Sequence, residues 1–165
     1  MRVPDILGPG LDVIFCGTAA GKTSAAFGHY YARPGNRFWQ VLAEVGLTPR
    51  RLNPADDVTL PGYGIGLTDL AKQHAGADQD IPDHAFQPDV LSAILARWQP
   101  RAVAFNGLKA ARVATGNRTL EPGLAMTRIS GCAIWILPST SGLATRWWNP
   151  APWNDLAAWV QGRQP

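Results

Sequence analysis

Apolar residues along the chain gather in short continuous runs, and between these runs they recur every three or four positions. Continuous apolar runs that end in glycine or proline predict buried β-strands, and the helical spacing predicts amphipathic helices. The predicted strands are LDVIFCG at 11–17, RAVAFNG at 101–107 and CAIWILP at 132–138, with YGIGLTDL at 63–70 as a weaker fourth. The predicted helices cover 36–46 and 88–98, and a last one begins near Pro152.

Strands that alternate with amphipathic helices are typical of a mostly parallel sheet covered on both faces. We therefore expect a three-layer α/β/α sandwich, which 165 residues form as a single domain over 1–165. The segment 123–137 predicts an antiparallel edge, because Ser130 and Gly131 favour a tight turn between two strands. Residues 76–86 are polar and rich in Asp, which predicts a surface loop.

The stretch VIFCGTAAGKTSAAF at 13–27 resembles a phosphate-binding loop, with Gly21-Lys22-Thr23 after an apolar run. Such a loop needs four residues between its first glycine and the Gly-Lys pair, but only three separate Gly17 from Gly21. A nucleotide hydrolase also needs an acidic magnesium ligand at the end of a second core strand, where this chain has Asn106 or Ser139. The glycines therefore point to another ligand.

The net charge and the two cysteines exclude few classes of protein. A net charge of +3 is compatible with a polyanionic partner without requiring one. Cys16 and Cys132 each lie in an apolar run, which favours buried reduced thiols and a cytoplasmic protein. No apolar run reaches bilayer length, so no membrane association is expected, and the histidines lack metal-ligand spacing, so neither a metal nor a cofactor is expected.

In an α/β sheet, ligands bind at the carboxyl ends of the strands. Four segments of this chain fall near that edge or before the first long helix: FCGTAAG, YYARPGNRFW, YGIGLTDL and LPSTSGL. Together, from about Leu7 to the final helix, they resemble the mismatch-specific uracil-DNA glycosylase family, which also contains thymine-DNA glycosylases. PGNRFW and SGL are the most specific pieces of this resemblance.

The resemblance implies a monomeric DNA repair enzyme that flips uracil out of double-stranded DNA, opposite guanine in particular. It implies hydrolysis of the N-glycosidic bond without a metal or cofactor. Tyr31 matches the residue that stacks on the flipped base, and Asn36 matches one that fixes the pocket, although Asn36 could instead cap its helix. The base pocket implied by the resemblance comprises Gly17, Thr18, Ala19, Ala20, Gly21, Ser24, Tyr31, Asn36 and Ser139.

The last motif matches the segment that enters the duplex where the base has left. Leu143 would be its apolar wedge, and the alternative is that Leu143 packs into the core. Arg146 and Lys22 would contact phosphates, or would be solvated surface residues. The residues assigned to intercalation and backbone contact are Ser141, Gly142, Leu143, Ala144, Arg146 and Lys22.

The chain departs from the family at its catalytic asparagine, whose position holds Ala19, and has Ser139-Thr140 where Asn-Pro is usual. We expect Asp69 to supply the missing chemistry, because it alone of the acidic residues lies just past a predicted strand at the edge where the motifs converge. The alternative is that Asp69 caps a turn or pairs with Lys72 at helical spacing. Two other functions stay open: a catalytically impaired module that senses DNA damage, and an unrelated small-molecule hydrolase.

Overall fold

A five-stranded sheet in the order β2-β1-β3-β5-β4 is the middle layer of the computed structural model, which describes residues 3–162. The four strands β2, β1, β3 and β5 run parallel, and β4 is antiparallel to β5. The strands are β1 (Val13–Ala20), β2 (Ile65–Ala75), β3 (Ala102–Asn106), β4 (Gly123–Ile129) and β5 (Cys132–Leu137). Strand β1 is flanked by β2 on one side and by β3 on the other, so the strand order reverses next to β1. In α/β sheets, ligands bind at such a switch point.

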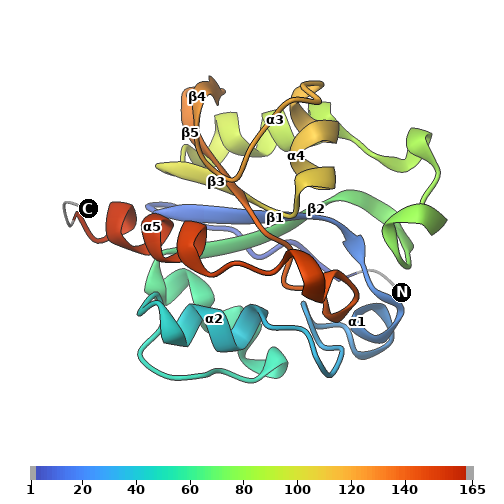
Figure 1. The fold of residues 1–165 in the computed structure, drawn as a ribbon, viewed down its shortest axis with the longest axis horizontal. Helices are drawn as coiled ribbons and strands as arrows, with labels where there is room; N and C mark the ends of the chain where they lie inside the picture. Colours follow the sequence, from blue (N-terminus) through green and yellow to red (C-terminus); the bar gives the residue numbers. More distant parts are fainter. Residues whose placement is uncertain (1–2, 163–165) are drawn as a thin grey trace.

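Helices cover both faces of the sheet (Figure 1). Val13 and Phe15 of β1 pack into a core with α2 and α5, whereas Ile14 and Cys16 point to the opposite core, under α3 and α4. The helices are α1 (Lys22–Phe27), α2 (Phe38–Glu44), α3 (Pro88–Trp98), α4 (Leu108–Thr115) and α5 (Ala151–Val160). Four 3₁₀ segments join them: η1 (Pro54–Tyr63), η2 (Asp78–Asp80), η3 (Asp83–Ala85) and η4 (Gly142–Trp147).

The predicted three-layer α/β/α fold is confirmed, and so is its antiparallel edge. Ser130 and Gly131, with φ of 50° and 83°, form the turn between β4 and β5. Both positive angles suit the tight turns that join antiparallel strands. Cys16 and Cys132 are free and buried, as predicted from their apolar runs.

Sequence periodicity missed two helices, α1 and α4. Both are short, with six and eight residues, and their buried positions include alanines at Ala25, Ala110 and Ala111. Small residues let a helix approach the sheet closely but give a weak apolar signal. The expected surface loop at 76–86 is also corrected, because it contains η2 and η3 and buries Ile81 and Phe86 in the second core.

Candidate active site

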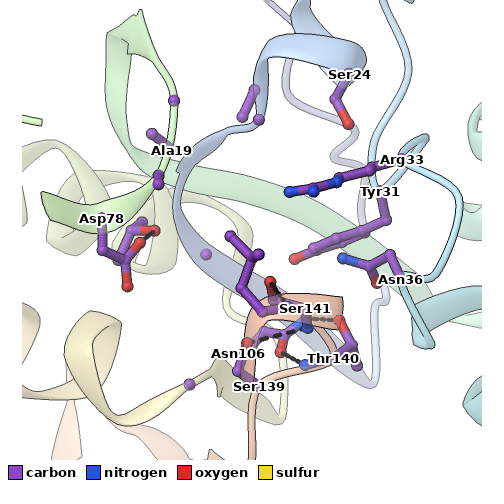
Figure 2. Close-up of a pocket in the computed structure, with 18 of the residues that line it drawn as sticks. Ala19, Ser24, Tyr31, Arg33, Asn36, Asp78, Asn106, Ser139, Thr140 and Ser141 are labelled. Carbon is purple, nitrogen blue, oxygen red and sulfur yellow. Dashed lines mark hydrogen bonds between the residues drawn. The ribbon is translucent and has the colours of Figure 1, made fainter. Parts of the chain in front are cut away.

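A cleft of about 720 Å³ opens at the carboxyl edge of the sheet. Its walls come from β1, from Asp69 within β2, from the end of β3, and from the segments 21–24, 30–36, 76–80, 107–110 and 139–144 (Figure 2). All nine residues predicted for the base pocket line this cleft: Gly17, Thr18, Ala19, Ala20, Gly21, Ser24, Tyr31, Asn36 and Ser139. The structure therefore brings together segments that lie more than a hundred residues apart in the sequence.

The segment predicted as a glycine loop is part of a strand, which corrects the expected local structure. Residues 17–20 belong to β1 and pair with β2, whereas the pairing of β1 with β3 ends at Cys16. On the β3 side, residues 17–20 therefore have no strand partner among the described residues. Backbone N–H and C=O groups on that side can bind a ligand in the cleft, since such groups need hydrogen-bond partners.

Asp69 lies inside the cleft, opposite Gly17 in the parallel β1–β2 pair. A Cβ atom on Gly17 would lie 2.7 Å from Oδ1 of Asp69, so only glycine admits the carboxyl group at this place. Asp69 was predicted to follow the end of a strand, but β2 continues to Ala75. Asp69 nevertheless lines the same cleft as Gly17 and Ser139, as the prediction required.

The surroundings of Asp69 favour its neutral form near neutral pH. Burial raises the pKa of Asp69 to about 7, Asp5 raises it further, and Lys72 and a backbone hydrogen bond from Gly17 oppose the rise. Lys72 does not pair with Asp69 at helical spacing, because it lies on a strand and its Nζ contacts Oδ1 of Asp5 at 2.5 Å. Asp5 also accepts a hydrogen bond from Thr68 Oγ1 at 2.8 Å, a contact between segments that local sequence patterns do not reveal.

Tyr31 presents its ring to the cleft from the segment before α2 (Figure 2). Its ring stacks on Phe38, with ring centroids 4.1 Å apart and an interplanar angle of 28°. Ser24 holds this segment in place, since its Oγ accepts a hydrogen bond from the backbone N–H of Ala32 at 2.9 Å. Arg33, which the sequence analysis did not select, also points into the cleft beside Tyr31.

Asn36 forms a hydrogen bond at the start of α2 and also lines the cleft. Its Oδ1 accepts a hydrogen bond from the backbone N–H of Phe38 at 3.0 Å, at the start of α2. Figure 2 shows the side-chain nitrogen turned toward the cleft, beside Tyr31. One end of the amide therefore stabilises the helix start, while the other is available to a ligand as a donor.

Asn106, at the end of β3, connects the sheet to the last motif; the sequence placed it at a strand end but assigned it no role in the pocket. Its Nδ2 donates to Thr140 Oγ1 at 2.9 Å, and its Oδ1 accepts from the backbone N–H of Thr140 at 3.0 Å. Ser139 Oγ accepts from the backbone N–H of Ser141 at 3.1 Å. These bonds fix the loop between β5 and η4 against the cleft, and the available signal was an asparagine that directly follows a buried strand.

The rim of the cleft carries the segment predicted to enter DNA. Leu143 is 67% exposed, which excludes the alternative that it packs into the core. Ser141 Oγ accepts from the backbone N–H of Leu143 at 3.1 Å, and a Cβ atom on Gly142 would lie 3.3 Å from the carbonyl oxygen of Gly35. The first contact caps η4, and the second requires a small residue where η4 meets the segment before α2.

Two other predicted residues have partners that the sequence did not indicate. Thr18 donates from Oγ1 to Asp78 Oδ1 at 2.6 Å and so ties β1 to η2, which forms one wall of the cleft. The guanidinium of Arg146 lies 5.0 Å from the ring centre of Trp147, outside the cleft lining. Ala144 and the exposed Lys22 do line the cleft.

Two further functional features are absent from residues 3–162. No group of three or more His, Cys, Asp or Glu side chains is placed to hold a metal ion. No helix in this range is both long and apolar enough to span a bilayer.

The fold and the cleft define an α/β/α domain with an open cleft at the carboxyl edge of a mostly parallel sheet. The sequence profile of the uracil DNA glycosylase superfamily matches residues 4–161, and the chain belongs to this superfamily. Its members are hydrolases that cleave N-glycosyl bonds in DNA.

A solved structure with the same fold is the solution NMR structure of a "putative Uracil DNA glycosylase" from Methanosarcina acetivorans. The two chains share 22% sequence identity over 97% of each, with a TM-score of 0.72. At this level of identity the likeness establishes the fold, and the substrate has to be argued from the cleft.

Proposed function

We propose that this protein excises uracil from double-stranded DNA by hydrolysis of the N-glycosidic bond, with G·U mismatches as preferred substrates. The observation that carries the proposal is the position of the Asp69 carboxyl group, which lies opposite Gly17 in the cleft. Gly17 belongs to the motif in which Ala19 stands at the position of the family asparagine. A carboxylate here can take over the activation of water that a methyl group cannot perform.

The cleft has the features needed to hold a flipped pyrimidine. The Tyr31 ring offers a stacking surface, and stacking of a base on an aromatic side chain contributes about 1–3 kcal/mol. The Asn36 amide nitrogen and the free backbone groups of residues 17–20 supply hydrogen bonds to the edge of the base. These donors also stabilise the negative charge that the departing base acquires.

Hydrolysis then requires one water molecule and one proton acceptor. The Asp69 carboxylate accepts a proton from water, the water oxygen forms a bond to C1′ of the sugar, and the electron pair of the glycosidic bond leaves with the base. The same carboxylate stabilises positive charge that develops on the sugar. Because burial raises the pKa of Asp69 to about 7, the base form is fully populated only above neutral pH.

The rim is suited to a duplex whose base has been extruded. Leu143 would fill the space left in the stack, and Gly142 lets the backbone of η4 approach closely. Lys22 on α1 and Arg146 on η4 would contact phosphates. We propose that a monomer suffices and that neither metal nor cofactor takes part.

Ala19 also supports a second candidate, a module that binds damaged DNA without cleaving it. The decisive experiment incubates the protein with G·U, A·U and G·T duplexes and with single-stranded uracil DNA, followed by alkaline strand cleavage. We expect cleavage at uracil, fastest for G·U, and unchanged after chelation of metals. Salt-dependent binding of G·U duplexes with no released base would establish the second candidate instead.

A further inference from the structure

The hydroxyl group of Tyr31 is buried and has no hydrogen-bond partner within residues 3–162. A buried polar group without a partner costs about 1–3 kcal/mol, and phenylalanine would stack equally well without this cost. Tyr31 also has a φ of 52°, a left-handed conformation that is unfavourable for a residue with a side chain. Both features indicate a side chain placed for a ligand rather than for packing.

The Tyr31 hydroxyl and the Asp69 carboxyl group both lie next to Gly17, on the side where a side chain at this position would project. A Cβ atom on Gly17 would lie 3.4 Å from the Tyr31 hydroxyl oxygen and 2.7 Å from Oδ1 of Asp69. The hydroxyl of Tyr30 is also buried without a partner, but it is not among the atoms nearest to this Cβ position. Asn106, at the neighbouring strand end, has both polar groups of its amide bonded to Thr140.

We propose that the Tyr31 hydroxyl and the Asp69 carboxylate together hold the attacking water, which makes Tyr31 a positioning residue as well as a stacking surface. The inference rests on the proposed function. The water donates one hydrogen bond to Asp69, accepts one from the Tyr31 O–H, and directs its remaining lone pair at C1′ of the extruded nucleotide. The proton passes to Asp69, the tyrosine keeps its own, and the base leaves with the bonding electrons.

Electrostatics support this division of roles. Burial raises the pKa of Tyr31 above its ordinary value, and the nearby Asp69 raises it further. The neighbouring Asn106 amide opposes this rise as a donor toward the hydroxyl oxygen, which leaves the Tyr31 O–H free to donate. The ionisable groups close enough to interact electrostatically with Asp69 are Lys72, Asp5, Cys16, Tyr30 and Tyr31. Only one member of the water-binding pair therefore changes its protonation near neutral pH.

The test is Tyr31→Phe, which keeps the ring and removes the hydroxyl. We expect single-turnover uracil release from a G·U duplex to slow by about 10- to 100-fold, the range for a misplaced reacting group. Affinity for a duplex carrying a non-hydrolysable uracil nucleotide should change less than about 2-fold, and the melting temperature should stay or rise. Tyr63→Phe is the matched control, because Tyr63 is 39% exposed and precedes β2 at the opposite edge of the sheet.

A double-mutant cycle with Asp69→Asn separates the inference from the proposed function. If both side chains hold the same water, Tyr31→Phe should have little further effect in the Asp69→Asn background. Three results would overturn the role of the hydroxyl while leaving glycosylase activity established. The rate losses of the two single variants could multiply in the double variant, Tyr31→Phe could leave the rate unchanged, or it could lower affinity as much as it lowers the rate. A wild-type protein that releases no uracil would overturn the proposed function itself, and the inference with it.

Discussion

The raised pKa of Asp69 predicts that replacing this residue stabilises the protein in a pH-dependent way. Burial raises this pKa from 3.8 to about 7, so the folded protein binds a proton that the unfolded chain has released between these two values. Stability contributed by the protonated group is fully present below about pH 4 and is lost as pH rises through 7. Asp69→Asn, which stays neutral, should therefore stabilise the fold most above pH 7.

The magnitude follows from the size of the pKa change. At 1.36 kcal/mol for each tenfold change in proton affinity, the rise to about 7 corresponds to about 4 kcal/mol as an upper limit. Lys72, Asp5 and the Gly17 backbone also act on the Asp69 carboxyl group, and they remain in the variant. We expect Asp69→Asn to raise the free energy of unfolding by about 2–4 kcal/mol at pH 8.5 and to have little effect at pH 4.

Urea unfolding of wild type, Asp69→Asn and the control Asp155→Asn at both pH values would measure this effect. Asp155 is exposed on α5, so its replacement should leave stability nearly unchanged at either pH. A stability difference for Asp69→Asn that is equal at pH 4 and pH 8.5 would refute the argument. It would mean that the carboxyl group is not desolvated in the folded protein.

Three further predictions concern the cleft. Uracil release by the wild type should rise with pH and level off above about 7, as Asp69 becomes the proton acceptor, and a flat profile from pH 5.5 to 8.5 would contradict this role. Gly17→Ala should lower the release rate at least 100-fold because its Cβ displaces the Asp69 carboxyl, whereas Gly62→Ala, with open space around it, should be neutral. Leu143→Ala should slow release from duplex more than from single-stranded DNA without changing the melting temperature, and equal losses on both substrates would rule out a wedge.

Much of this fold could be predicted from the sequence because its core strands are continuous apolar runs buried on both faces. Phe15 and Cys16 point to opposite cores, a pattern that only a sheet between two helical layers produces. The helix α4 was missed because its buried positions are alanines, which carry little apolar contrast. The length of β2 was missed because Lys72, Gln73 and His74 do not have the composition of a buried strand.

Gly17 and Asp69 could be proposed as site residues because they follow apolar runs in the sequence, although both lie within β1 and β2 and not at the strand ends. Contacts between segments distant in the sequence could not be predicted, since local patterns contain no information about them. The bond between Thr18 and Asp78 joins residues 60 positions apart, and Asp5 reaches Thr68 across 63 positions. Asn36 shows a different limit, because the sequence posed a helix cap and a pocket residue as alternatives, whereas one amide oxygen bonds the start of α2 and the amide nitrogen is turned toward the cleft.

The assignment of the chemistry to Asp69 is the central claim, and single-turnover release of uracil from a G·U duplex at pH 8 tests it most directly. Wild type, Asp69→Asn and Asp69→Ala would be compared, with duplex affinity measured in parallel on a non-hydrolysable substrate. We predict that both variants fold and bind the duplex but release uracil about 10²- to 10⁴-fold more slowly than the wild type. Release at the wild-type rate by both variants would contradict the account.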